Sequence, residues 1–199
     1  MNFDKLILAT HNKHKAEELQ AMLGDLGVEV LTLDAFPRVG EIVEDAETLE
    51  ENALKKAKEV FGATGIPAMA DDTGLEVFYL NKAPGVYSSR YAGPEATYAD
   101  NCRKLLSNMK GVPPRRRAAQ FRCVLAFIAP GMVPILEEGV CRGAITEFPR
   151  GEAGFGYDPI FLPDGYDQTF AEMPLEVKNI ISHRGRALLK MKETLKAHL

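Results

Sequence analysis

A short apolar run that passes directly into helical spacing is the feature that most constrains the fold of this chain. Residues 6–9, LILA, contain no polar side chain and have the length of a strand, which predicts a strand covered on both faces. The apolar side chains that follow recur at three- and four-residue intervals: Ala16, Leu19, Met22 and Leu23. Gly24 and Gly27 then supply a stop signal. Residues 10–15 are therefore expected to span a strand end and a helix start.

The composition is that of an ordinary globular protein. Hydrophobic residues make up 46% and charged residues 26% of the 199 residues, and no repeat, linker or domain boundary is visible, so we expect a single domain over residues 1–199. Lys and Arg number 24 against 28 Asp and Glu, and the net charge of -4 argues against a general binder of nucleic acids or acidic membranes. A polyanion would have to be bound locally.

The cysteines and the N-terminal residues predict a cytoplasmic protein. Cys102, Cys123 and Cys141 lie about twenty residues apart without a C-x-x-C pair, as expected for reduced thiols in a core. The apolar run near the N-terminus has only four residues, which is too short for a signal peptide or a membrane span.

Capping residues and β-prone runs predict the other elements. A second helix begins at the capping box Thr48-x-x-Glu51 and ends near Gly62. Two strand segments are predicted within residues 66–80, with a break at residues 71–74, and a helix over about 95–109. The β-prone residues 118–129 and short strands within 133–147 are expected to form an antiparallel block. A last helix is capped by Ser182 and has its apolar side chains on one side: Ala187, Leu188, Met191 and Leu195.

The junction at residues 10–15, THNKHK, combines a helix N-terminus with cations. The first N–H groups of a helix lack partners and the helix dipole is positive there, so an anion such as phosphate is favoured. The candidate phosphate-binding residues are Thr10, His11, Asn12, Lys13, His14 and Lys15. The alternative is that Thr10 and Asn12 merely cap the helix while the lysines are solvated. The glycine pattern of a P-loop is absent.

The second helix carries a lysine on its apolar side. At about 100° per residue, Asn52 and Lys56 fall within the arc of its apolar side chains, unlike Lys55 and Lys58. A core-facing lysine needs an anion, either a ligand or an acidic side chain, unless it reaches solvent from the edge of the stripe. Lys56 is therefore a candidate substrate-binding residue.

Two adjacent acids, Asp71 and Asp72, end an apolar strand in the sequence MADDTG. Neighbouring strand residues point to opposite faces, so only one of the two is expected to reach a given metal ion. A divalent cation relieves their repulsion, and Mg²⁺ prefers one or two carboxylates with water and phosphate oxygens. Glu44 is a candidate second carboxylate. A solvated acidic turn that ends at Gly74 is the alternative.

Two later motifs offer contacts for a base and for an anion. In GFGYDP, residues 154–159, glycines let the backbone approach a ligand and an aromatic ring can stack on a flat base, although both aromatic residues could equally lie in the core. In ISHRGRAL, His183 and Arg184 lie in a first helical turn beyond Lys178, where acids are normally favoured. This indicates either an external anion or a pair of surface cations. Together, the motifs supply the parts of a site for Mg²⁺ and a nucleoside triphosphate.

The same motifs resemble those of the inosine triphosphate pyrophosphatase family, specifically the bacterial XTP/dITP diphosphatases. THNKHK is similar to the [ST]-x-N-x-x-K signature and ETLEENALKKA to the T-x-x-E-N-A-x-x-K-A helix. The segments ADDTGLEV, GVYSSRYAG, GFGYDPIF and ISHRGRAL follow in the family's order, so the resemblance covers about residues 5 to 195. Thr73 stands where serine is common in bacterial members, and its hydroxyl preserves the chemistry.

The resemblance implies an enzyme that hydrolyses ITP, dITP and XTP to the monophosphate and pyrophosphate with Mg²⁺, and so removes deaminated purines from the nucleotide pool. It also implies an elongated α/β fold, with a mixed sheet and two lobes flanking a central substrate cleft, and a homodimer. We expect no nucleic-acid or membrane partner.

The resemblance further assigns the metal site. Glu44 and Asp72 would hold Mg²⁺, and Asp72 would position a water for in-line attack on the α-phosphorus. Asp45 or Glu41 could take the place of Glu44, because the length of this segment varies. A nucleotide sensor that does not hydrolyse is a rival function, and it would share the cations but would not need Asp72 to activate water.

The remaining assignments concern the substrate. Within residues 10–15, Asn12 and Lys15 match the phosphate signature most closely. The other implied substrate contacts are Lys56 and Thr73, then Phe155, Gly156, Tyr157 and Asp158 around the base and sugar, and Lys178, His183 and Arg184 around the purine. Nucleic-acid binding through Arg115–Arg117 is a third function, but such a run is more simply a solvated loop.

Overall fold

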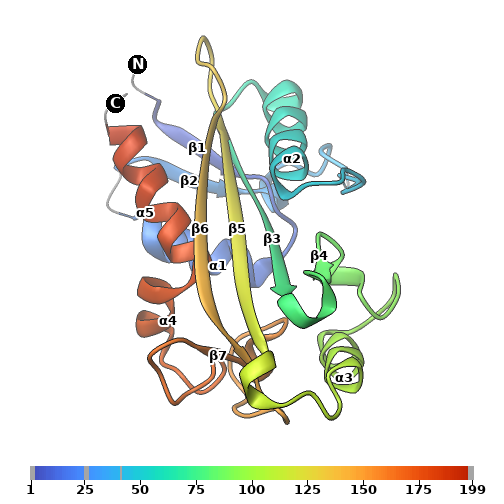
Figure 1. The fold of residues 1–199 in the computed structure, drawn as a ribbon. Helices are drawn as coiled ribbons and strands as arrows, with labels where there is room; N and C mark the ends of the chain where they lie inside the picture. Colours follow the sequence, from blue (N-terminus) through green and yellow to red (C-terminus); the bar gives the residue numbers. More distant parts are fainter. Residues whose placement is uncertain (1–2, 25–26, 41, 197–199) are drawn as a thin grey trace. The chain divides into compact units, whose positions relative to one another are not determined.

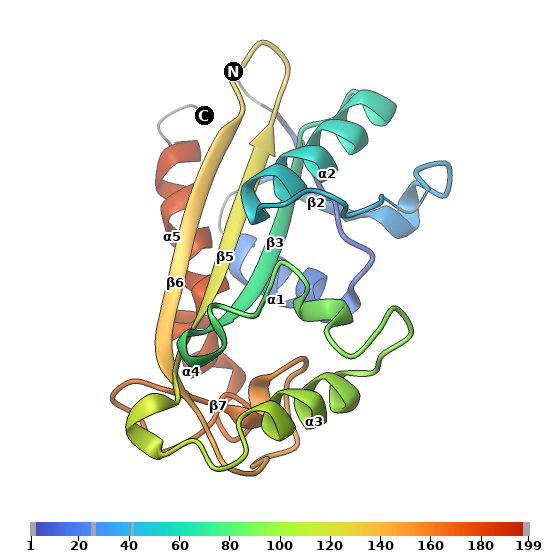
Figure 2. The same cartoon turned by 45° about the vertical axis from the view of Figure 1, so that its right-hand side comes forward.

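Helices and strands alternate along much of the chain, as Figures 1 and 2 show. The structure is a computed structural model and describes residues 3–24, 27–40 and 42–196. The helices are α1 (Lys13–Leu23), α2 (Leu49–Thr64), α3 (Tyr98–Asn108), α4 (Leu175–Ile181) and α5 (His183–Lys196). The strands are β1 (Lys5–Leu8), β2 (Glu29–Thr32), β3 (Ala68–Val77), β4 (Pro84–Gly85), β5 (Ala118–Ile128), β6 (Ile135–Ile145) and β7 (Phe161–Pro163).

The strands pair in both directions, which confirms an α/β fold with a mixed sheet. β1 is parallel to β2 and to β3, with Leu6 opposite Val30 and Ile7 opposite Ala68. β4 is antiparallel to β3, and β7 is antiparallel to β6. The order of hydrogen-bonded neighbours is β2-β1-β3-β5-β6-β7, with β4 attached to β3. The strand and helix predicted at the start of the chain are confirmed as β1 and α1.

Contacts between Cα atoms divide the chain into two compact units. Unit 1 comprises Met1–Asp72, Cys123–Gly139 and Arg184–Leu199, and unit 2 comprises Thr73–Arg122 and Val140–His183. The chain passes from one unit to the other within β3, β5 and β6 and again at the start of α5. The single domain expected over residues 1–199 stays a prediction.

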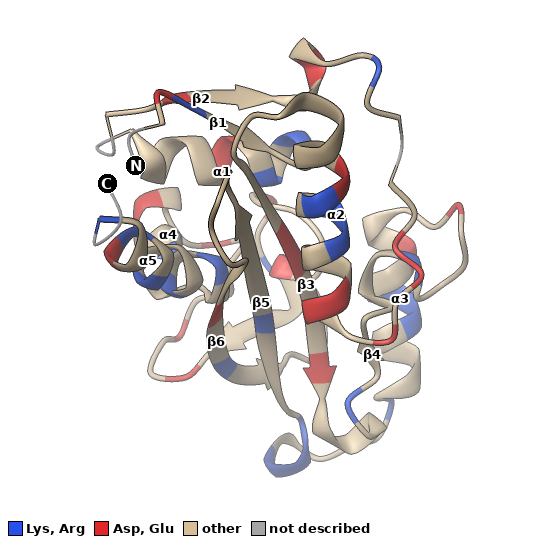
Figure 3. Cartoon of the chain, turned by 90° about the horizontal axis from the view of Figure 1, so that it is seen from above, with Lys and Arg blue, Asp and Glu red and all other residues tan. Residues whose placement is uncertain are grey.

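The core of unit 1 follows from the alternation of side chains along its strands. One strand face packs against α1 and α5, and its apolar cluster comprises Leu6, Leu8, Leu19, Leu23, Met69, Cys123, Leu125, Phe127, Ala129, Ala187, Leu188, Met191 and Leu195. Neighbouring strand residues such as Ile7 and Ala70 therefore point to the other face. α2 covers that face, and Figure 3 shows α2 across β3 from α1 and α5. The buried side of α2 includes Leu49, Ala53, Ala57 and Val60.

The core of unit 2 combines α3 with packed aromatic rings. α3 begins with a full capping box, because the Thr97 hydroxyl accepts from the N–H of Asp100 and the Asp100 carboxylate accepts from the N–H of Thr97. Rings from three segments pack together: Phe121, Phe161 and Phe170. The Phe121 and Phe161 ring centroids are 4.7 Å apart.

β3 differs most from the sequence prediction. It runs without a break from Ala68 to Val77, so the predicted interruption at residues 71–74 is wrong. The reason is that cationic side chains from the surrounding helices neutralise Asp71 and Asp72, which lets both acids remain in a buried strand. β6 is likewise one strand of 11 residues rather than several short ones.

The start of α2 agrees with the sequence prediction, and its end does not. Thr48 caps α2 by accepting from the N–H of Glu51, as predicted. The helix continues past Gly62 and ends where Gly65 takes a left-handed conformation with φ of 70°.

The cysteines are free and buried, as predicted: Cys102, Cys123 and Cys141. Within residues 3–24, 27–40 and 42–196, no helix is long and apolar enough to cross a membrane.

Candidate functional site

Asp71 and Asp72 lie in the middle of β3 and contact different helices. Asp71 pairs with Lys15 from α1 and Arg184 from α5. Asp72 pairs with Lys56 from α2. Figure 3 shows this pattern as acidic segments on β3 and basic segments on α2. The expected alternation of the two acids is confirmed, and each has its own cations.

Lys56 lies on the buried side of α2, as its place in the apolar arc predicted, and is only 6% exposed. Its Nζ donates to Glu44 Oε1 and lies 3.4 Å from Asp72 Oδ1. Burial alone would lower the pKa of this amine, but Asp72 and the nearby acids Asp71 and Glu44 raise it, so Lys56 stays protonated. Acidic side chains therefore supply the anion that Lys56 needs, and the alternative in which it reaches solvent from the edge of the stripe is wrong.

Arg184 belongs to a second buried charge cluster in unit 1. Its guanidinium is 2% exposed, donates to Glu18, and lies 3.2 Å from Asp71 Oδ2. Lys15 Nζ lies 3.0 Å from the same oxygen. Burial alone would raise the pKa of Asp71, but Lys15 and Arg184 lower it far below its usual range. The anions beside Arg184 come from within the chain, so its interpretation as a surface cation is wrong.

Asn12 caps α1 at the turn proposed to bind phosphate. Its Oδ1 accepts from the N–H groups of His14 and Lys15, and Thr10 Oγ1 accepts from the N–H of Asn12. The capping part of the alternative is therefore confirmed for Asn12, but Lys15 pairs with buried Asp71 and is not a solvated lysine. The exposed side chains of this turn are His11, Lys13 and His14. A phosphate role for the turn stays a prediction.

Glu44 and Asp72 share one cation, and their chemistry fits a divalent metal. Asp72 Oδ2 is buried and has no hydrogen-bond partner among the described residues. Burial raises the pKa of Asp72, and this outweighs the lowering effect of Lys56. A metal ion would satisfy the oxygen and favour the ionised carboxylate. The described residues contain no cluster of three or more His, Cys, Asp or Glu suited to a metal, so a site here would use two carboxylates with oxygens of water and substrate.

Asp45 and Glu41 are the alternative metal ligands near Glu44. Asp45 Oδ1 lies 2.7 Å from Lys55 Nζ, and the Asp45 side chain is 65% exposed. The hydrogen bond to Lys55 lowers the pKa of Asp45. Glu41 lies outside the described residues.

Asp158 organises the glycine-rich loop of unit 2. Its Oδ2 accepts from the N–H of Phe155 at 2.9 Å and from Lys178 Nζ at 2.7 Å. Gly154 has φ of 76°, and a Cβ there would collide with the Asp158 carboxylate, so glycine is required. Lys178 Nζ also lies 4.9 Å from the centroid of the Phe155 ring. The loop thus joins a half-buried ring to a buried ion pair.

Other predicted substrate residues of unit 2 contribute to its core. The Tyr157 hydroxyl is buried and donates to the carbonyl of Ser88 at 2.8 Å, which confirms the core alternative for this ring. His183 is buried with its ring stacked on Phe121, and the two ring centroids are 4.5 Å apart. The half-buried members are Thr73, Phe155 and Gly156.

Glu18 is a buried charge that the sequence analysis missed. It lies on the buried side of α1, beside Leu19, and accepts a hydrogen bond from Arg184. The signal that identified Lys56, a charged residue within an apolar helical arc, would also have identified Glu18.

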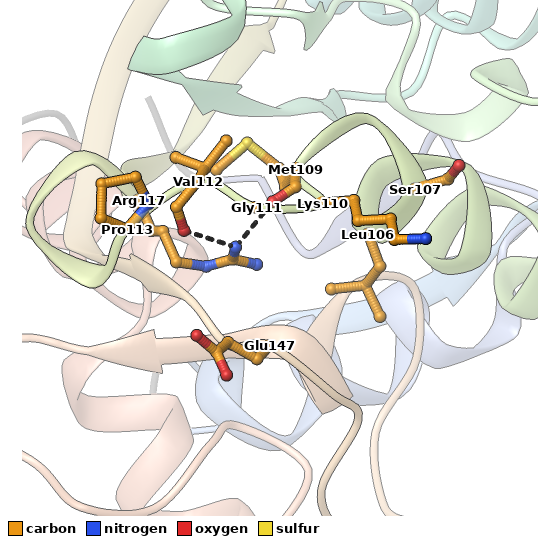
Figure 4. A pocket seen from close by; sticks show the side chains of 9 residues that line it. All are labelled: Leu106, Ser107, Met109, Lys110, Gly111, Val112, Pro113, Arg117 and Glu147. Atoms are coloured by element: carbon orange, nitrogen blue, oxygen red, sulfur yellow. Dashed lines mark hydrogen bonds between the residues drawn. The ribbon is translucent and has the colours of Figure 1, made fainter.

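Arg117 borders a pocket of about 550 Å³ in unit 2 (Figure 4). The lining residues are Leu106, Ser107, Met109, Lys110, Gly111, Val112, Pro113, Arg117 and Glu147, and they include none of the predicted site residues. The guanidinium donates to the carbonyls of Met109, Val112, Ile145 and Thr146. Arg117 is 5% exposed, so both a solvated loop and a nucleic-acid contact are wrong for this residue.

The chain is similar to known proteins over nearly its whole length. Residues 6–194 match the Ham1 family. A dITP/XTP pyrophosphatase of Geobacter sulfurreducens is 48% identical over 191 residues, covering 96% of this chain and 96% of that protein. One from Desulforamulus reducens is 49% identical, with 96% and 95% covered. The solved structure of a HAM1 protein from Coxiella burnetii, at 41% identity, covers 97% of this chain and 98% of that chain with a TM-score of 0.88. The resemblance predicted from the motifs is confirmed.

Proposed function

The chain belongs to the Ham1 family, and on this premise we propose that it hydrolyses deaminated purine nucleoside triphosphates, namely ITP, dITP and XTP, to the monophosphate and pyrophosphate. The relatives named dITP/XTP pyrophosphatase support this substrate class. The observation that carries the proposal is the pair of carboxylates, Glu44 and Asp72, around buried Lys56. A protein that only binds nucleotides has no need of a buried carboxylate whose pKa is raised.

Glu44 and Asp72 are the proposed ligands of Mg²⁺. Bound there, the ion would neutralise charge on the phosphate oxygens and make the phosphorus more electrophilic. Lys56 would then exchange its two carboxylate partners for a phosphate oxygen, because a buried ammonium needs an anionic partner.

Asp72 is the proposed general base. It accepts a proton from a water molecule as the water oxygen bonds to the α-phosphorus, and the bond from that phosphorus to the bridging oxygen breaks so that pyrophosphate leaves. Without a bound ion, burial raises the pKa of Asp72, so this carboxylate takes up a proton more readily than an exposed aspartate. Its Oδ2, which accepts no hydrogen bond from the described residues, would bind the ion, and Oδ1, which Lys56 would release, would accept the proton from the water.

The phosphate tail is assigned to cations of unit 1. Lys15 keeps 16% of its side chain exposed beside Asp71 and is the proposed phosphate contact at the start of α1. Lys13 adds an exposed cation in the same turn. Asn12 and Thr10 hold the backbone of this turn in place.

The base and sugar are assigned to residues of unit 2. The half-buried Phe155 ring can stack on a purine, and Lys178 can donate to the 6-carbonyl oxygen that ITP and XTP carry in place of the amino group of ATP. The other proposed contacts are Thr73, Gly156, Tyr157, Asp158, His183 and Arg184.

Pyrophosphate release from a panel of nucleoside triphosphates with Mg²⁺ tests the proposal. We expect ITP, dITP and XTP to be preferred over ATP and GTP. Asp72→Asn should reduce turnover of ITP by about 10²–10⁴-fold, the range for a lost general base. Asp34→Asn is the control, because this exposed aspartate has no part in the proposed site and should leave turnover unchanged. Nucleotide binding without pyrophosphate release would instead favour a sensor, and an active Asp72→Asn would exclude the assigned base.

The homodimer that the family resemblance implies stays a prediction. Sedimentation velocity of the whole chain measures the mass directly. A sedimenting mass of 21.9 kDa would identify a monomer and contradict it.

A further inference from the structure

Asn52 is a buried polar residue of α2 to which the proposed function assigns no role. It is 1% exposed and lies one helical turn before Lys56, on the same side of α2. Its Oδ1 accepts from the N–H of Ala46 at 3.0 Å. This contact fixes the orientation of the amide, since only the oxygen can accept, and leaves Nδ2 as the donor. Nδ2 is buried and has no hydrogen-bond partner in the part of the chain that the structure describes.

Ala46, which Asn52 holds, belongs to the same segment as Glu44. Residues 42–46 form neither helix nor strand. Hydrogen bonds with α2 side chains hold this segment at three successive residues: Lys56 donates to Glu44, Lys55 donates to Asp45, and Asn52 accepts from the N–H of Ala46. The segment therefore takes its position from α2 side chains rather than from a backbone ladder.

The three contacts differ in what they can do when a metal ion binds. The contact from Lys56 uses the Glu44 carboxylate itself, so a bound cation would compete with it. The contact from Lys55 is made between partly exposed side chains and is weak. The contact from Asn52 is part-buried, is uncharged and holds the backbone, so it is the one that can persist while Glu44 binds a cation.

We propose that Asn52 is a positioning residue for Glu44, an inference that rests on the proposed function. By holding the backbone at Ala46, Asn52 keeps the Glu44 carboxylate on the side of α2 where Lys56 meets Asp72. It thereby sets the affinity of the carboxylate pair for Mg²⁺.

A purely structural role for Asn52 makes a different prediction. A buried donor without a partner is unfavourable, and a leucine of similar size removes it. Ala46 is half-buried, so its N–H can bond to water when the asparagine is absent. A structural role therefore predicts that Asn52→Leu leaves both stability and metal binding at or above wild type. The positioning role predicts that stability is kept while affinity for Mg²⁺ is lost.

The test is a Mg²⁺ titration of the whole protein without nucleotide, in which the shift in Tm measures binding. We expect Asn52→Leu to have a Tm close to that of wild type without metal and a Kd for Mg²⁺ about 10–100-fold weaker, the usual cost of losing a residue that orients a metal ligand. Asn52→Asp keeps an acceptor for the N–H of Ala46 and should bind Mg²⁺ at least as tightly as wild type. Lys55→Met removes only the partly exposed contact and should match wild type.

Each outcome decides the inference. Equal Mg²⁺ affinity in wild type and Asn52→Leu overturns the positioning role. An Asn52→Asp variant that binds Mg²⁺ as weakly as Asn52→Leu overturns it as well, and so does a wild type whose Tm does not change with Mg²⁺. Asn52→Ala gives the same comparison if the leucine variant does not fold. A wild type that binds Mg²⁺ but releases no pyrophosphate from ITP refutes the proposed function alone, and the positioning role is then still judged by the variants.

Discussion

Replacing Lys56 with methionine removes the charge between Glu44 and Asp72 while keeping an unbranched, buried side chain. At 3.4 Å and an effective dielectric constant of about 20, the attraction between Lys56 and Asp72 alone is about 5 kcal/mol. Losing one partner of a buried ion pair typically costs about 3–5 kcal/mol, because the remaining charge stays buried. We expect Lys56→Met to lose about 3 kcal/mol of unfolding free energy at pH 7. For a chain of this size, that lowers Tm by about 6–12 °C.

Mg²⁺ should recover part of this loss. In wild type, the ion must compete with an ammonium group that already contacts both carboxylates. In the variant that competitor is gone, so binding to the folded state should be tighter and should stabilise it through mass action. We expect saturating Mg²⁺ to raise the Tm of Lys56→Met by at least about 2–4 °C more than that of wild type, which corresponds to about 1 kcal/mol.

The assay is thermal unfolding with and without Mg²⁺, with urea unfolding as an independent measure of free energy. Lys55→Met is the matched control, because Lys55 is adjacent in sequence and paired with Asp45, but the two side chains are 33% and 65% exposed. An exposed pair contributes at most about 1 kcal/mol. A Lys56→Met variant as stable as Lys55→Met would refute the inference that Lys56 forms a stabilising buried ion cluster with Glu44 and Asp72. Equal Mg²⁺ shifts in Lys56→Met and wild type would refute the competition for the carboxylates.

Two further predictions concern groups whose pKa is shifted. Lys15 and Arg184 hold the pKa of Asp71 far below its usual value near 3.9, so Asp71 contributes stability above about pH 4 that is lost as the pH falls below it. Asp71→Asn should cost about 3 kcal/mol at pH 7 and flatten the acid dependence of urea unfolding, and an unchanged acid dependence would contradict this. Burial raises the pKa of Cys102 to about 11, so at pH 8 only about one molecule in a thousand carries the thiolate. Alkylation of Cys102 by iodoacetamide, followed by peptide mass spectrometry, should be at least about 100-fold slower in the folded protein than in urea, and equal rates would exclude the shift.

Local patterns determined much of the fold and part of the candidate site. The apolar arcs of α1, α2 and α5 and the caps Thr48 and Asn12 follow from backbone geometry within a few residues. The same periodicity placed Lys56 on the buried side of its helix. Strand alternation separated Asp71 from Asp72 before any partner was known.

The partners of the buried charges were decided only by tertiary packing. Arg184 meets Asp71 across 113 residues and Glu18 across 166 residues, and no local pattern connects such positions. Because these cations neutralise the acids, β3 continues where the sequence predicted a break. Local periodicity therefore indicated that Lys56 faces the interior and that Asp71 and Asp72 point to opposite faces, but it did not lead to Glu18 or to the burial of Arg184. Which opposite charge each one meets was decided by the packing of α1, α2 and α5 against β3, since the free energy of a buried charge depends on neighbours that only the folded chain brings together.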